Sequence, residues 1–151
     1  MDLVVRGICG LVPGVKGLSE KITVRSLLGR FLEHSRVYHF QNAPKGRRTY
    51  LGSADWMPRN FFRRVEVAFP IEDTEMEAEI LETTDGFFRD NQFATELRSR
   101  GNYVSSARKG RKAFALQDKL VEQSIEATNQ EIESLRLGRA SGKAEDQGEG
   151  N

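Results

Sequence analysis

Two short polar segments carry residue types from which a phosphate-binding site can be built. One is His34-Ser35-Arg36, between a Leu- and Phe-rich run and a strand-like run. A histidine can hold a phosphoryl oxygen, transfer a proton or become phosphorylated, and the planar guanidinium of an arginine matches two phosphate oxygens. The other is 52–60, GSADWMPRN, in which a glycine lets a ligand approach the backbone. A half-buried structural histidine and an ordinary turn have the same composition, so both interpretations stay open.

Arg6 is a third candidate because it interrupts the apolar run LVVRGIC at residues 3–9, which predicts a buried strand. A buried guanidinium without an anion beside it is costly in free energy. Its partner could be an internal acid such as Glu66, or it could be the phosphate of a ligand. The sequence pattern does not choose between these two partners.

Basic residues are concentrated in the first half of the chain. Residues 1–70 hold 12 Lys/Arg against 5 Asp/Glu (+7), and residues 71–151 hold 11 against 17 (−6), which together give the net charge of +1. A basic half attracts polyanions such as nucleotides, inorganic phosphate chains, nucleic acid or an acidic partner. A path for a phosphate chain could be formed by Arg36, Arg59, Arg63 and Arg64. Pairing of the last three with neighbouring acids is an equal alternative.

The elements that must position these groups are both strands and helices. Apolar alternation predicts strands at 3–9, 36–41, 48–53 and 62–70, and a hairpin at 93–107 that turns at Gly101-Asn102. Helical spacing predicts helices at 26–33, 74–88 and 112–136, the second opened by the capping-box pattern Thr74-x-x-Glu77. This order indicates an α/β (α+β) fold in which helices pack on a mixed sheet.

Length and composition indicate one soluble domain with an appendage. We expect a domain over 1–136 and a disordered acidic tail over 137–151, which has almost nothing to bury. No apolar run approaches the roughly 20 residues of a membrane span, and the N-terminus lacks a secretory signal. The single cysteine, Cys9, cannot form an internal disulfide, so we expect a cytoplasmic protein.

Several uncommon strings together resemble one family. His-x-Arg followed by Gly-Ser-x-Asp is similar to a half-site of the phospholipase D superfamily. The strings VRGICGL, FLEHSR, YLGSADWMPRN and RRVEVAFPI closely resemble the C-terminal domain of bacterial polyphosphate kinase, the long multidomain type, which shares the phospholipase D-like architecture. The resemblance covers about residues 2–135 and implies a phospholipase D-like mixed sheet with packed helices.

The resemblance also implies a reaction. In this family ATP donates its terminal phosphate to a histidine, and the phosphohistidine then extends a polyphosphate chain. Arg6 and His34 match residues that line the nucleotide phosphates, and His34 is implied to be catalytic without being the residue that is phosphorylated. The phosphorylated histidine and the groups that hold magnesium lie in a preceding domain. The implied cofactor is ATP with Mg²⁺ in the full-length enzyme, and no metal site is expected in this chain.

The implied partners are ATP or ADP, inorganic polyphosphate, the N-terminal portion of polyphosphate kinase if it is separately encoded, and a second copy of the chain. Nucleic acid is not expected, and membrane association is expected only through the full complex. Met1 directly precedes the DLVVRG string, where the family has further domains, so we expect a fragment that is inactive alone. Two alternatives are a phospholipase D-like phosphodiesterase formed by a homodimer and a non-catalytic polyanion-binding module.

Overall fold

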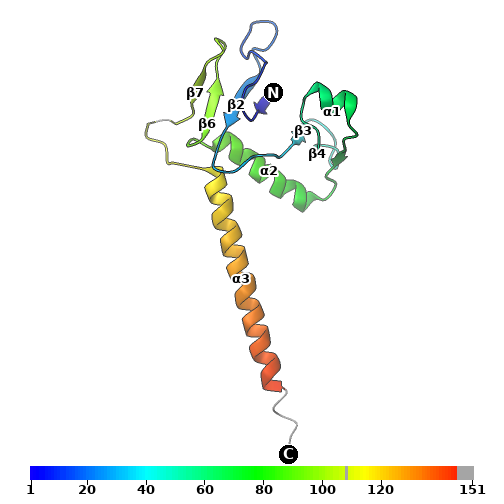
Figure 1. Cartoon of the computed structure of the whole chain (residues 1–151), viewed down its shortest axis with the longest axis vertical. Helices are drawn as coiled ribbons and strands as arrows, with labels where there is room; N and C mark the ends of the chain where they lie inside the picture. The colour runs from blue at the N-terminus through cyan, green and yellow to red at the C-terminus, as the bar shows by residue number, and fades with distance from the viewer. Residues whose placement is uncertain (108, 146–151) are drawn as a thin grey trace, which may run out of the picture. The chain divides into compact units, whose positions relative to one another are not determined.

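The structure, a computed structural model, describes residues 1–107 and 109–145, with side chains described for 1–107 and 109–136. The chain divides into two compact units, one from Met1 to Leu116 and one that begins at Gln117. The first unit contains two β-sheets and two helices, and the second contains nearly all of the long helix α3 (Figure 1).

The first sheet is mixed and has the strand order β1-β2-β6-β7. Its strands are β1 (Asp2–Val4), β2 (Thr23–Leu27), β6 (Ala94–Leu97) and β7 (Tyr103–Ser105). β1 runs parallel to β2, whereas β2–β6 and β6–β7 are antiparallel pairs. Because β2 lies between two strands, its side chains Val24 and Leu27 are buried, with 0% and 2% of their surface exposed. This sheet confirms the expected mixed α/β fold.

The second sheet is antiparallel and has the strand order β3-β4-β5. Its strands are β3 (Val37–His39), β4 (Thr49–Gly52) and β5 (Ala68–Pro70). The expected hairpin between β3 and β4 is confirmed, and its turn is closed by a hydrogen bond of 3.1 Å from the Arg47 amide to the Pro44 carbonyl. The His34-Ser35-Arg36 segment precedes β3 and the 52–60 loop follows β4, so this sheet positions both polar segments.

Two helices complete the first unit, α1 (Pro58–Arg63) and α2 (Thr74–Arg89). The helix expected at 74–88 is confirmed. Its N-cap is Asp73 and not Thr74, because the Asp73 carboxylate accepts two backbone amides of the first turn at 2.9 Å. The expected hairpin that turns at Gly101 is also confirmed, and Gly101 has a φ of 82°.

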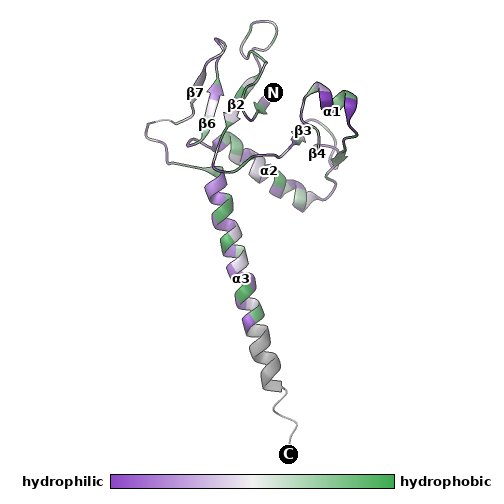
Figure 2. Cartoon of the chain, in the orientation of Figure 1, coloured by the Kyte–Doolittle hydropathy of each residue, from purple (hydrophilic) through white to green (hydrophobic). Residues whose placement is uncertain are grey.

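Helix α3 (Leu116–Glu145) accounts for all of the second unit that the structure describes. Hydrophobic and hydrophilic residues alternate along it, as the sequence predicts (Figure 2). The helix begins four residues later than expected and continues past residue 136. Of the tail expected over 137–151, residues 146–151 lie outside the described residues. Within 1–107 and 109–145, no helix is long and apolar enough to cross a membrane.

Two predicted elements are wrong. Residues 26–33 form no helix, because β2 continues to Leu27 and the residues after it have no regular structure. Their apolar spacing is compatible with a helix, but pairing with strands on both sides holds β2 extended. The strand predicted at 62–70 forms only at its end, as β5. Its start belongs to α1, where Pro58 occupies the first turn that proline favours.

Candidate functional site

His34, Arg36 and Asp55 meet beside the second sheet. The Arg36 guanidinium donates from Nε at 3.0 Å and from Nη2 at 2.9 Å to Asp55 Oδ1. It also contacts His34, with Nη2 2.8 Å from the ring Nε2 and Nη1 3.2 Å from the backbone carbonyl. The two polar segments of the sequence are therefore joined by one arginine side chain.

Asp55 holds Arg36 in a fixed position. The side chain of Arg36 is 16% exposed and that of Asp55 is 43% exposed. The hydrogen bond from Arg36 keeps the pKa of Asp55 below its ordinary value against the opposing effect of burial, with smaller contributions from the charges of Arg36 and Arg59. Asp55 is thus ionised at neutral pH, and it balances the charge of the arginine that it anchors.

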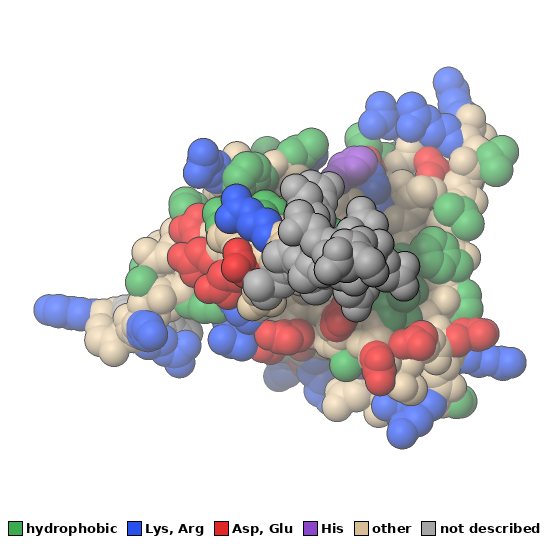
Figure 3. Space-filling model, turned by 90° about the horizontal axis from the view of Figure 1, so that it is seen from below, with side chains coloured by type: hydrophobic (Ala, Val, Ile, Leu, Met, Phe, Trp, Pro, Cys, Tyr) green, Lys and Arg blue, Asp and Glu red, His purple; other side chains and the backbone are tan. Residues whose placement is uncertain are grey.

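The contact with Arg36 assigns the proton on His34. A guanidinium only donates hydrogen bonds, so Nε2 must accept, which requires a neutral imidazole with its proton on Nδ1. The second distance, 3.5 Å from Nη1 to Nδ1, is too long for a good hydrogen bond. Figure 3 shows that basic and acidic side chains are mixed on the face of the chain that it presents. The side chain of His34 is exposed. His34 can therefore offer Nδ1–H to an incoming anion.

The loop after β4 supports Asp55 from both sides. Asn60, which is buried in α1, donates from Nδ2 to the Asp55 carbonyl at 3.0 Å. Trp56 donates from Nε1 to the Tyr38 hydroxyl at 3.0 Å, although its side chain is 79% exposed. A Cβ on Gly52 would lie 3.2 Å from Cε2 of Tyr38, so glycine allows this close packing of the loop on β3. These contacts position Asp55 through the backbone of the loop and leave its carboxylate free to pair with Arg36.

Arg6 is not buried within a strand, which corrects the expectation from sequence. β1 ends at Val4, and Arg6 lies exposed in the bend that follows. The next residue, Gly7, has a φ of 83° and donates its amide to a serine hydroxyl of β2 at 3.1 Å, so the backbone of the bend is well positioned. Within the described residues Arg6 has no acidic partner and no hydrogen bond to His34. Glu66 instead accepts a hydrogen bond from Ser53.

The other expected arginines lie on or directly after α1. Arg59, Arg63 and Arg64 are all exposed, and in the part of the chain that the structure describes none of them forms an ion pair. Arg59 is close enough to Asp55 to lower the pKa of its carboxyl group. Their pairing with Glu66, the alternative interpretation from sequence, is therefore not present.

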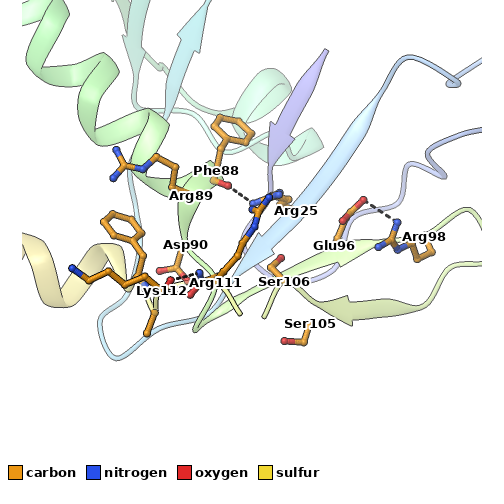
Figure 4. A pocket seen from close by; sticks show the side chains of 13 residues that line it. Arg25, Phe88, Arg89, Asp90, Glu96, Arg98, Ser105, Ser106, Arg111 and Lys112 are labelled. Atoms are coloured by element: carbon orange, nitrogen blue, oxygen red, sulfur yellow. Dashed lines mark hydrogen bonds and ion pairs between the residues drawn. The ribbon is translucent and has the colours of Figure 1, made fainter. Parts of the chain in front are cut away.

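The structure contains a second group of basic side chains that was not predicted from the sequence. Five of them line one pocket of about 490 Å³: Arg25, Arg89, Arg98, Arg111 and Lys112 (Figure 4). A signal exists in the run RKGRK at 108–112, but counting charge over the whole of 71–151 hides this run within an acidic total.

No metal centre is visible among the described side chains, because no group of three or more His, Cys, Asp or Glu residues there could hold an ion. Magnesium prefers oxygen ligands in octahedral arrangement. The side chains gathered here are cations and N–H donors, which suit anionic oxygens.

The fold and the paired histidine and arginine define an α/β domain suited to contact phosphate groups. Residues 1–117 match the family model of the polyphosphate kinase C-terminal domain 2. The chain therefore belongs to the polyphosphate kinase family, which confirms the resemblance that the sequence strings carry.

Individual relatives agree with this assignment. The polyphosphate kinases of Paraburkholderia phytofirmans and Burkholderia multivorans are 55% and 54% identical over 104 residues, which covers 68% of this chain and 15% of each relative. The crystal structure of polyphosphate kinase from Porphyromonas gingivalis matches with a TM-score of 0.73 and 34% identity, covering 85% of this chain and 19% of that chain. The chain thus spans less than a fifth of the length of these relatives.

Proposed function

We propose that this chain contributes part of the site at which a polyphosphate kinase transfers the terminal phosphate of ATP to polyphosphate, through a phosphohistidine outside this chain. The observation that carries the proposal is the Arg36 guanidinium, which is anchored on Asp55 and contacts the exposed ring of His34. A fixed guanidinium and a neutral N–H donor on one surface can bind two oxygens of one phosphate group. The names of the relatives, polyphosphate kinase, support polyphosphate as a substrate and phosphoryl transfer as the reaction.

The proposed step is a displacement at phosphorus. A histidine nitrogen attacks the γ-phosphorus, the bond to the bridging oxygen breaks, and ADP leaves with the electron pair of that bond. Arg36 balances the charge on the non-bridging oxygens without reorganising, because Asp55 already holds it in place. His34 holds one of these oxygens through Nδ1–H. Arg6, exposed on the bend after β1, is the proposed ligand of a second nucleotide phosphate.

Substrates and partners follow from the same proposal. Mg²⁺ bound to ATP would supply additional positive charge, and we propose that its protein ligands lie outside this chain. Arg59, Arg63 and Arg64 guide the polyphosphate chain over α1. The rest of the enzyme is the proposed protein partner, because Phe62 and Val65 are 85% and 102% exposed and would be covered by it. The chain alone is proposed to be inactive and cytoplasmic.

A chimera tests the proposal. Residues 1–117 of this chain replace the matching segment of the Paraburkholderia phytofirmans enzyme, and polyphosphate synthesis from ATP is measured. We expect His34→Ala and Arg6→Ala to lower kcat at least a hundredfold, because each removes a group that contacts the transferred or adjacent phosphate. His39→Ala is the matched control, since His39 is also exposed but contacts Thr49.

Normal synthesis by the His34→Ala chimera would refute the site assignment. A polyanion-binding module is the second candidate function, and the exposed arginines of α1 favour it. It predicts an inactive chimera, together with salt-sensitive binding of polyphosphate by the isolated chain that His34→Ala leaves unchanged.

A further inference from the structure

The basic pocket of the first unit lies beside β2, β6 and the end of α2, on the other sheet from the His34 segment. Its volume is about 490 Å³, which leaves room for several phosphate groups. Five basic residues line it against two acidic ones, a formal charge of +3. The two acids are Asp90 and Glu96, and both are already engaged.

Both carboxylate oxygens of Asp90 accept hydrogen bonds from backbone amides. Its side chain is 1% exposed, and Oδ1 accepts the amides of Gln92, Phe93 and Ala94 at 3.0, 2.8 and 3.2 Å. Oδ2 accepts the amide of Leu116 at 2.9 Å. With four amide donors around it, this carboxylate has little capacity left to accept hydrogen bonds from the arginines, and its charge is already included in the +3 of the pocket.

Glu96 is engaged too, because it pairs with Arg98 at 3.1 Å (Figure 4). Arg25 stands directly opposite Glu96 in the register of β2 and β6, but no carboxylate pairs with it among the described residues. The half-buried guanidinium of Arg25 donates only to the Phe88 carbonyl at the end of α2. A partly buried arginine with most of its donors unused indicates an anion as the missing partner.

The segment that carries Arg111 and Lys112 is held in place before any ligand arrives. Asn91 forms two hydrogen bonds with the backbone of Phe114: its amide donates to the carbonyl at 3.0 Å, and its side-chain Oδ1 accepts the amide at 2.9 Å. Asn91 Nδ2 also donates to the Lys112 carbonyl at 2.9 Å. A segment fixed in this way loses little conformational entropy when its side chains bind an anion.

A buried hydroxyl gives independent support. The oxygen of Ser106, which lines the pocket beside β7, is buried and has no hydrogen-bond partner among the described residues. A buried hydroxyl without a partner is unfavourable, and a phosphate oxygen would satisfy it. Together with Arg25, it is the second polar group in this pocket that lacks its expected partner.

We propose that this pocket binds a run of linear condensed phosphate, three or more units long. Charges spread over five side chains suit a chain of phosphates better than a single ion. A nucleotide is a poorer fit because the Phe114 ring, on which a base could stack, is already covered by an arginine. Arg89 covers the ring of Phe114, with Cζ 4.7 Å from the centroid, and the ring of Phe88 points away from Arg25 (Figure 4).

An NMR titration of the full chain with tripolyphosphate tests this site separately from the proposed catalytic one. Amide signals of Gln92 and Ser106 report the pocket, and those of Arg36 and Ser53 report the other site. We expect the pocket signals to shift, and Arg111→Gln/Lys112→Gln to weaken this response at least tenfold. Lys45→Gln/Arg47→Gln removes the same charge from an exposed turn of the other sheet, and we expect less than a twofold effect.

Equal effects of the two double variants would show general charge attraction and would overturn the proposal. An unchanged response in Arg111→Gln/Lys112→Gln would overturn it as well. ATP or orthophosphate that shifts the pocket signals as strongly as tripolyphosphate would reject the condensed chain as the ligand. Arg25→Gln is a second variant, whose folding is checked by circular dichroism. If tripolyphosphate shifts the pocket signals of the unmodified chain but leaves those of Arg36 and Ser53 unchanged, this result would count against the proposed function and not against the pocket.

Discussion

Replacing Asp90 with asparagine is the sharpest test of how the first unit is held together. Oδ1 accepts the amides of Gln92, Phe93 and Ala94, and Oδ2 accepts that of Leu116. Asparagine keeps one acceptor oxygen, so its NH₂ group would face the Leu116 amide as a second donor. A buried donor without an acceptor costs about 1–3 kcal/mol. With Asp90 1% exposed, we expect the free energy of unfolding to fall by about 2–3 kcal/mol.

Asp90→Ala removes all four acceptor bonds, so we expect a loss of more than about 4 kcal/mol, which is exceptional for one substitution. Asp73→Asn is the matched control. It makes the same chemical change at the exposed cap of α2, where asparagine caps about as well as aspartate. Urea unfolding followed by circular dichroism gives the midpoints, and a constant slope shows that the changes are changes in stability.

The expected order of destabilisation is Asp90→Ala, then Asp90→Asn, then Asp73→Asn. An Asp90→Asn midpoint equal to that of Asp73→Asn would refute the claim that both oxygens of Asp90 stabilise the fold. If Asp90→Ala were no worse than Asp90→Asn, the three bonds to Oδ1 would contribute nothing measurable.

Three further outcomes are expected. The pKa of Asp55 is held below its ordinary value, so the Arg36–Asp55 pair stabilises the fold above the pKa that Asp55 has in the unfolded chain. This stabilisation is lost as the pH falls through the lower pKa of the folded chain. In Arg36→Gln, an NMR titration should therefore give a higher midpoint for the Asp55 carboxyl group. Gly86→Ala places a Cβ 2.4 Å from Leu116 Cδ1, so overpacking of about 1–3 kcal/mol should exceed the helix-propensity gain of about 1 kcal/mol and lower the thermal midpoint. Tyr103→Phe removes the hydroxyl that accepts the Cys9 amide at 3.0 Å, which should cost about 1 kcal/mol in urea unfolding.

Elements with local causes could be predicted from the sequence. The β3–β4 hairpin depends on the NAPKG turn, where Gly46 has a φ of 75°, and the β6–β7 hairpin depends on Gly101 in the same way. Helix α2 depends on a cap and on apolar spacing within 16 residues. In each case the residues that decide the conformation lie within the element or next to it.

Elements with distant causes could not be predicted. Leu27 and Leu28 adjoin in sequence, yet Leu27 is 2% exposed and Leu28 is 63% exposed, because pairing with β1 and β6 decides which residues face the core. The candidate site has the same limit. The sequence singled out His34 and Arg36, but only the meeting of two loops shows that Asp55 anchors Arg36.

An arginine buried within a strand needs an anion, and strand order decides which arginine is buried. β1 is an edge strand that ends at Val4, so Arg6 emerges into solvent and pays no desolvation cost. β2 is central, and Arg25 lies between the buried residues Val24 and Ser26. Within the described strands the guanidinium without a carboxylate partner is therefore that of Arg25, and the same physical cost favours an anion beside it.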